Sequence, residues 1–295
     1  MSNDNHSSIF IIGAAKCGTT ALADLLDRHP DIELSEPKES DFFSDRVFVR
    51  GFEWYESCYG RKPGANYRLD ASVSYSIGWG ENGSDSIAKR IYERDNNAII
   101  IYIVRDPVQR AWASYWHDVR NMNADTNIRP EQSILEPNSA HLKGGMYYQR
   151  LSEYLKYFSK DKILVLHQQQ LKNNPAEVLK MINQLVQLES LEKLADLEQK
   201  SVNSSYQFNA AGRLITKVVP IEFIKRLAHF SNRCLPSFVN RMIRERISNP
   251  IPQIGPELSK KLVSLYEADA KLLFDDFGID VRNGSWWTGD NNQGV

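Results

Sequence analysis

The chain has 295 residues, of which 42% are hydrophobic and 25% charged, a composition that suits one large α/β domain with appendages. A net charge of −1 at pH 7 gives no overall attraction to nucleic acid or to anionic membranes, so any basic site must be local. The three cysteines, Cys17, Cys58 and Cys234, have no Cys-x-x-Cys spacing, which argues against a disulfide framework and against a zinc site.

The apolar runs of the chain are short. Residues 1–6 are polar, and the apolar run that follows them is too short for an export signal. No run reaches the length that a membrane-spanning helix needs. We therefore expect a cytoplasmic protein without a membrane span, in a reducing compartment.

Predicted strands and helices alternate along the first two thirds of the chain. In chain order they are a strand (8–13), a helix (19–28), a strand (66–72), a helix (85–94), a strand (98–104), helices (107–120 and 147–159), a strand (162–167) and a helix (176–188). The run at 98–104 is rich in β-branched residues without polar alternation, which is typical of an interior strand of a parallel sheet. Residues 121–145 are polar and contain prolines, so we expect a long surface loop there.

This alternation predicts an α/β fold: a central, mostly parallel sheet flanked by helices. From residue 191 onward no strand signal remains. Amphipathic segments near 212–230, 238–247 and 256–276 predict a mainly helical C-terminal part over 189–290, packed on the α/β core of 8–188. We expect one domain over residues 1–295.

The most informative segment is a loop bounded by Gly13 and Gly18. These glycines keep the spacing of the nucleoside-triphosphate loop G-x-x-x-x-G-K-[ST], and Thr20 keeps its hydroxyl. Thr19, however, stands where that loop has its lysine, and Lys16 lies inside the loop instead. The N-terminus of the following helix suits an anion, but the cation is directed at a different atom than in an NTPase.

Two further segments are expected beside this loop, because connections after parallel strands open at the same edge of the sheet. One is the stretch EPKESDFF at 36–43, and the other is RDPVQR at 105–110. Together with GAAKCGTT at 13–20, these segments resemble, in order and spacing, the sulfotransferases that use 3′-phosphoadenosine 5′-phosphosulfate (PAPS), in the group of bacterial and heparan-type carbohydrate enzymes. Weaker matches lie at 145–147, 165–175 and near Trp286.

The resemblance implies a P-loop-like sulfotransferase fold and a donor, PAPS, that leaves as adenosine 3′,5′-bisphosphate. It implies a saccharide or small-molecule acceptor with a hydroxyl or amine, and neither a metal nor a nucleic acid partner. By the same resemblance Lys16 holds the 5′-phosphate of the donor and stabilises charge on the bridging oxygen. Cys17, Gly18, Thr19 and Thr20 complete the anion-binding loop.

Glu39 matches the glutamate that acts as general base in the heparan-type enzymes, and Glu36 is a second candidate. Arg105 matches the residue that binds the 3′-phosphate, a contact suited to a guanidinium. The serine that the family has on the following helix falls at Ala113 here, so Ser114 is the candidate to replace it.

Other matches are weaker. The loop at 201–205, with Arg213 beyond it, occupies the place where relatives close over the nucleotide. Arg110 is expected to serve packing or a surface ion pair, and His117 is a candidate lining residue of the acceptor pocket. Some heparan-type enzymes have a lysine at the position of Ala71, so any contribution of that lysine on the substrate side of the site is absent here.

Two other classes of function stay open at this stage. A P-loop kinase or NTPase would depend on Mg²⁺ and would need a lysine beside Gly18, which this chain lacks. A nucleotide-binding protein without turnover is suggested by Ala113.

Overall fold

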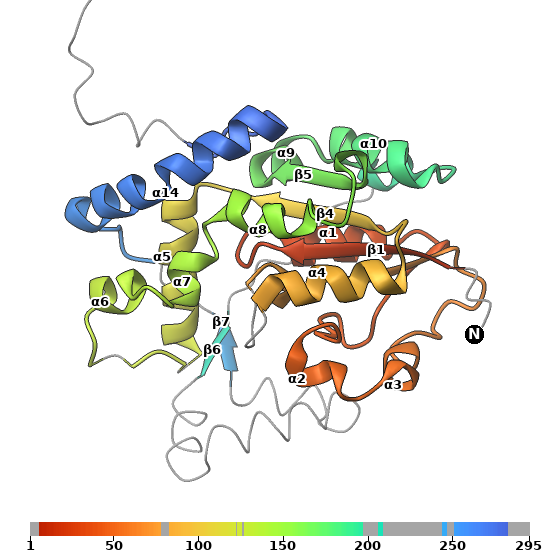
Figure 1. The fold of residues 1–295 in the computed structure, drawn as a ribbon, viewed down its shortest axis with the longest axis horizontal. Coiled ribbons are helices and arrows are strands. Elements are labelled where there is room, and N and C mark those ends of the chain that lie inside the picture. Colours follow the sequence, from red (N-terminus) through yellow and green to blue (C-terminus); the bar gives the residue numbers. More distant parts are fainter. Residues whose placement is uncertain are drawn as a thin grey trace, which may run out of the picture.

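The computed structural model describes residues 6–77, 83–121, 123–125, 127–196, 206–208, 244–246 and 251–282. A five-stranded sheet of order β2-β3-β1-β4-β5 forms the centre of the fold, and all its neighbouring strands are parallel. Helices flank this sheet (Figure 1). The predicted parallel α/β architecture is therefore confirmed.

The strands of the sheet are β1 (Ser7–Gly13), β2 (Ile32–Leu34), β3 (Tyr67–Asp70), β4 (Ile99–Val104) and β5 (Ile163–His167). The helices up to β5 are α1 (Thr19–Leu26), α2 (Asp45–Phe48), α3 (Phe52–Glu56), α4 (Gly83–Arg94), α5 (Pro107–Arg120), α6 (Pro130–Leu135), α7 (Ala140–Lys143) and α8 (Tyr147–Tyr154). After β5 come α9 (Gln168–Asn173), α10 (Pro175–Val186) and α14 (Pro256–Phe277).

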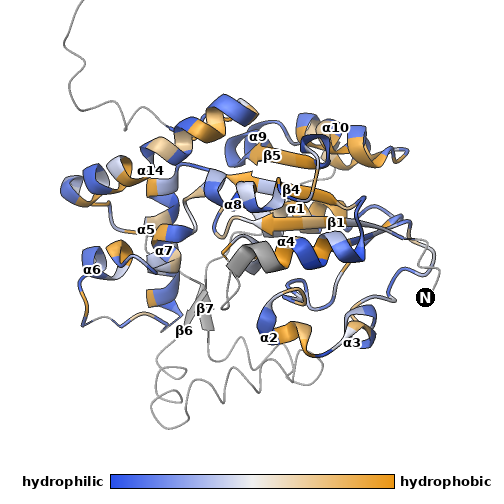
Figure 2. Cartoon of the chain, in the orientation of Figure 1, coloured by the Kyte–Doolittle hydropathy of each residue, from blue (hydrophilic) through white to orange (hydrophobic). Residues whose placement is uncertain are grey.

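The core lies on both sides of the interior strands. Every residue of β4 is buried, and Ile9 of β1 lies opposite Leu69 of β3 and Ile99 of β4. Figure 2 shows hydrophobic residues concentrated in β1, β4 and β5, while the flanking helices carry both polar and apolar residues. The apolar run at 98–104 thus has the interior position that its composition predicts.

The prediction of a long surface loop at 121–145 is wrong for much of that segment. Helices α6 and α7 lie within it, and Ile134, His141 and Leu142 are buried. Both helices pack beside α5, which also contacts α14 (Figure 1). Since α6 and α7 are only one or two turns long, their few apolar residues make no periodic pattern.

The C-terminal part departs from its prediction in one respect. Helix α14 confirms the segment at 256–276, but β6 (Tyr206–Phe208) pairs antiparallel with β7 (Arg244–Arg246), so strands do follow residue 188. Residues 244–246 were expected in a helix. Three-residue strands are too short to show alternation in a sequence. The predicted helix at 212–230 and Trp286 lie outside the described residues.

Within the described residues, no helix combines the length and the apolar character that a membrane crossing requires.

A buried carboxylate fixes the segment that follows β2. Asp70, at the end of β3, accepts hydrogen bonds from the hydroxyl groups of Ser40 (2.6 Å), Ser72 (2.6 Å) and Tyr75 (2.8 Å). The Ser72 hydroxyl in turn accepts the backbone N–H of Asp41 at 3.0 Å. Burial raises the pKa of Asp70 to about 6, against the opposing effect of its three hydrogen bonds. This network holds residues 40 and 41 against the end of β3.

We expect Asp70→Asn to destabilise the fold, because the amide nitrogen only donates, whereas the hydroxyl oxygen of the neutral acid that it replaces both donates and accepts. The loss should be about 1–3 kcal/mol at pH 4.5. An unfolded aspartate has a pKa of about 3.9, below the folded value of about 6. Ionisation of Asp70 therefore weakens the wild type as the pH rises from about 4 through about 6.

The asparagine variant lacks this titration, so its deficit relative to the wild type should shrink between pH 4.5 and pH 7. Urea unfolding of both proteins at the two pH values measures the difference. A deficit in unfolding free energy that stays constant or grows with pH would contradict the raised pKa of Asp70.

Candidate active site

The loop between β1 and α1 lies against Ser76, in the turn after β3, and is bonded to β4. Gly13 has φ of +151°, and a Cβ there would lie 2.2 Å from Ser76 Oγ, so only glycine fits. The N–H of Ala14 donates to the carbonyl of Ile103 in β4 at 2.7 Å. The loop is therefore a fixed part of the sheet edge.

The main chain of Lys16 is fixed by two side chains. Lys16 has φ of +70°, a conformation that few non-glycine residues adopt. Its carbonyl accepts hydrogen bonds from Arg105 Nη1 at 3.1 Å and from Gln168 Nε2 at 3.4 Å. The ends of β4 and β5 thus both contact the loop at the residue that carries its cation.

The side chain of Lys16 lies among charged groups. Its Nζ is 3.1 Å from Nδ1 of His117 on α5. Burial lowers the pKa of Lys16, an effect opposed by the carboxylates of Asp118 and Glu39 and reinforced by the guanidinium groups of nearby arginines, Arg105 among them. The charges of Glu39 and Arg105 therefore both act on Lys16.

The anion-binding part of the loop is formed by the start of α1. Gly18 is the N-cap with φ of +103°, and its carbonyl accepts the N–H of Leu22. In a helix, the N–H groups before that first bond, here those of Thr19 and Thr20, have no partner within the helix and suit an anion. Thr19 is buried and Thr20 is exposed.

Cys17 has another environment. Its backbone N–H donates to the carbonyl of Ala14 at 3.1 Å. The predicted contact between this N–H and the nucleotide PAPS is therefore not supported. The thiol is buried, 3.9 Å from the Tyr147 hydroxyl, and burial raises its pKa to about 11. It is a neutral packing group.

The structure distinguishes the two candidate glutamates. Glu39 lies close enough to Lys16 for its charge to act on that lysine, and its Oε1 is 3.1 Å from Lys38 Nζ. The side chain of Glu36 is 65% exposed and pairs with Arg61 at 3.7 Å. Of the two, Glu39 is therefore the one whose charge is shown to act on Lys16.

Arg105 lines a pocket of about 440 Å³ together with Gln109, Trp112, Ala113 and residues 251–254. Ser114 does not line it, because its Oγ is 3.0 Å from Nδ1 of His141 on the other side of α5. Successive helical residues point about 100° apart, so the one-residue shift turns the hydroxyl away. The predicted contact between Ser114 and the nucleotide PAPS is not supported by this geometry.

Two further expectations have plain outcomes. Arg110 is buried, donates to the carbonyl of His141 and packs against Gly144, so the packing alternative is confirmed and the surface ion pair is wrong. Arg213 and the loop at 201–205 lie outside the described residues.

Sequence reasoning missed three polar residues around the site. Gln109 lines the Arg105 pocket one helical turn before Ala113, a spacing visible in the sequence. Gln168 opens α9, a six-residue helix without a detectable pattern. Lys38 places its ammonium 3.1 Å from the carbonyl of Ala71, the position where the family resemblance implies a lysine.

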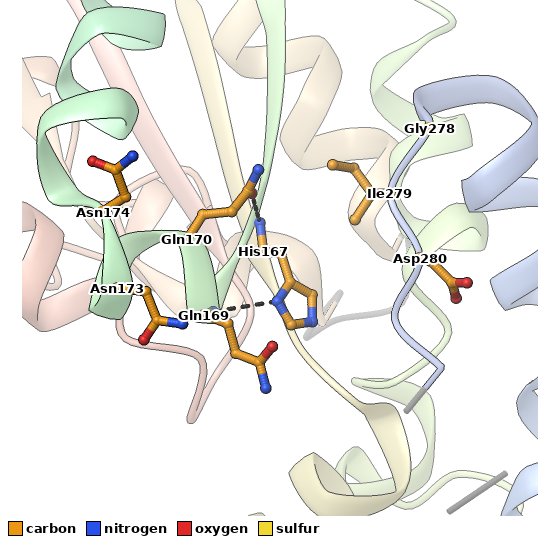
Figure 3. A pocket seen from close by; sticks show the side chains of 8 residues that line it. All are labelled: His167, Gln169, Gln170, Asn173, Asn174, Gly278, Ile279 and Asp280. Atoms are coloured by element: carbon orange, nitrogen blue, oxygen red, sulfur yellow. Dashed lines mark hydrogen bonds between the residues drawn. The ribbon is translucent and has the colours of Figure 1, made fainter. Parts of the chain in front are cut away.

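Another pocket of about 440 Å³ lies at the end of β5. Its lining residues are His167, Gln169, Gln170, Asn173, Asn174, Gly278, Ile279 and Asp280 (Figure 3). The figure shows how the start of α9 is capped: the Gln169 N–H donates to His167 Nδ1, and the His167 N–H donates to the Gln170 side chain. None of the predicted site residues that the structure describes lines this pocket.

Comparisons with known proteins agree with the geometry. A family model described as "Sulfotransferase domain" matches residues 6–222. The chain is similar to the bifunctional heparan sulfate N-deacetylase/N-sulfotransferase 1 of Caenorhabditis elegans, with 26% identity over 280 residues, which are 90% of this chain and 29% of that protein. It is also similar to the mouse heparan sulfate glucosamine 3-O-sulfotransferase 5, with 24% identity over 77% of this chain and 64% of that protein.

The chain thus spans less than a third of the first relative and just under two thirds of the second. Among solved structures, the sulfotransferase from Alicyclobacillus acidocaldarius has the same fold, with a TM-score of 0.64 and 20% identity over 96% of this chain and 99% of that one. Since the family match covers most of the chain, this protein belongs to the sulfotransferase domain family.

Proposed function

We propose that this protein transfers a sulfonyl group from PAPS to a hydroxyl or amine of an acceptor. The observation that carries the proposal is the position of Lys16, inside a glycine-bounded loop and within reach of the charges of Glu39 and Arg105. The match to the sulfotransferase domain family supports it. A P-loop kinase or NTPase is not favoured, since Thr19 occupies the place of its lysine.

The reaction is an in-line displacement at sulfur. A proton passes from the attacking hydroxyl or amine of the acceptor to the Glu39 carboxylate as the acceptor atom bonds to sulfur. The bond between sulfur and the bridging oxygen breaks, and its electron pair stays on that oxygen, now part of the 5′-phosphate of adenosine 3′,5′-bisphosphate. The ammonium of Lys16 and the N–H groups at the start of α1 stabilise this developing charge.

Arg105 has two tasks in this proposal. One of its five N–H donors is used by the Lys16 carbonyl, and its side chain also lines the pocket before residues 251–254. The remaining donors suit the 3′-phosphate, which distinguishes PAPS from nucleotides without that group.

The acceptor class is the open part of the proposal. The names of the similar heparan sulfate enzymes favour a saccharide, and a small molecule is the alternative. The cytoplasmic location remains a prediction.

Calorimetric titration tests the donor site directly. We expect adenosine 3′,5′-bisphosphate to bind with a stoichiometry near one in the presence of EDTA, because the site's positive charge comes from side chains and helix N–H groups. Label from [35S]PAPS should then pass to one member of a panel of desulfated heparan fragments, phenols and amines. Binding of ATP with Mg²⁺ in preference to the bisphosphate would contradict the proposal.

Glu39→Gln should separate binding from chemistry. We expect unchanged affinity for adenosine 3′,5′-bisphosphate and a transfer rate lower by about 10²–10⁴-fold, the usual cost of losing a general base. Glu36→Gln is the matched control and should transfer at nearly the wild-type rate. Equal losses in the two variants would remove Glu39 from its role.

Arg105→Ala should reduce the preference for a 3′-phosphate. The ratio of affinities for adenosine 3′,5′-bisphosphate and adenosine 5′-monophosphate should fall by about 10- to 100-fold, on the scale of a charge-assisted hydrogen bond. The ratio isolates the 3′ contact from any effect of Arg105 on the Lys16 loop. Ser114→Ala should leave the ratio unchanged, and an unchanged ratio for Arg105→Ala would refute the assignment.

A further inference from the structure

Lys38 is the side chain that contacts the candidate base. Its Nζ lies 3.1 Å from Oε1 of Glu39 and 3.1 Å from the carbonyl oxygen of Ala71. The side chain of Lys38 is 22% exposed, whereas that of Glu39 is 41% exposed. A lysine that is more buried than its carboxylate partner, and tied to a backbone carbonyl, is unlike a mobile surface ion pair.

The segment that carries Lys38 is itself anchored to β3. The carbonyl of Lys38 accepts the hydroxyl of Ser35 at 3.0 Å, and the N–H of Ser35 donates to the carbonyl of Leu69 at 2.9 Å. Ser35 is buried. Both ends of Lys38, its backbone and its ammonium, are therefore joined to residues at the end of one strand.

Glu39 needs such support. A half-exposed glutamate has several side-chain torsions, and ordering them opposes catalysis unless another contact has already fixed the carboxylate. The neighbouring network fixes only the backbone that follows it, through Ser40, Asp41 and Asp70. Within the described part of the chain, the hydrogen bond from Lys38 is the one that reaches the carboxylate itself.

We propose that Lys38 is a positioning residue, whose ammonium holds Oε1 of Glu39 so that Oε2 takes the proton of the acceptor. This inference rests on the proposed sulfonyl transfer. In the step itself, the acceptor's proton moves to Oε2 and neutralises the carboxylate, while the hydrogen bond from Lys38 to Oε1 persists. The geometry of the base is thus the same before and after proton transfer.

A double-mutant cycle tests the inference. Lys38→Met should lower kcat for the transfer of label from PAPS by about 10- to 100-fold, the scale of a misplaced catalytic group. Affinity for adenosine 3′,5′-bisphosphate should stay unchanged, and the urea unfolding midpoint should fall modestly, because the carbonyl of Ala71 loses its hydrogen bond. In the Glu39→Gln background, Lys38→Met should cause no further loss, because the carboxylate that it positions is gone.

Two additional variants complete the design. Lys38→Arg keeps a cation and should retain more activity than Lys38→Met. Lys271→Met removes an exposed lysine that pairs with Asp275 on α14, and it should have wild-type kcat at the same change in net charge.

Three results would overturn the inference: a kcat within threefold of the wild type for Lys38→Met, the same loss in the Glu39→Gln background, or a loss of donor affinity that matches the loss of kcat. If the wild-type protein neither binds the bisphosphate nor transfers label, the proposed function itself fails, before any variant is compared.

Discussion

The hydrogen bond from the Arg105 guanidinium to the Lys16 carbonyl joins the two halves of the proposed donor site. Strands β1 and β4 are parallel neighbours, so the loop after one and the turn after the other open at the same edge of the sheet. The bond fixes the main chain of a residue with positive φ, from which the ammonium reaches His117 and the charged groups around it. Without this bond, the lysine and the arginine would be separate features of two loops.

The candidate base lies in the segment after β2, which has its own support. Residues 40 and 41 are held on the buried Asp70, and Glu39 is held by Lys38, so the acidic stretch is attached to the end of β3 at several points. The sheet thus supplies three rigid connections, from β1, β3 and β4, to one region of its edge. A site built in this way places its groups by backbone geometry and leaves little to side-chain mobility.

Much of this arrangement is visible in the sequence, for physical reasons. A fully buried strand such as 98–104 has to be apolar throughout, and a glycine-bounded loop has a fixed spacing, so both produce clear patterns. Strand β2 and helices α6, α7 and α9 are too short for any periodicity. Their positions depend on tertiary contacts such as those of Ile134 and Leu142 with the α5 and α14 layer.

Details at the level of single side chains depend on helix phase. Whether residue 113 or residue 114 faces the Arg105 pocket follows from where α5 begins. Asp106 sets that point, because it is the N-cap of α5 and its side chain accepts the N–H of Gln109. The position of Lys38 beside Ala71 joins the segments that follow β2 and β3, so it appears only in three dimensions.

The central claim is that the Lys16 loop, supported by Arg105, binds the 5′-phosphate of a sulfated nucleotide. A crystal structure of the protein with adenosine 3′,5′-bisphosphate tests it most directly. We expect the 5′-phosphate at the start of α1, with Lys16 Nζ moved from His117 to within hydrogen-bond distance of a phosphate oxygen. A nucleotide bound elsewhere, with Lys16 still on His117, would contradict the account.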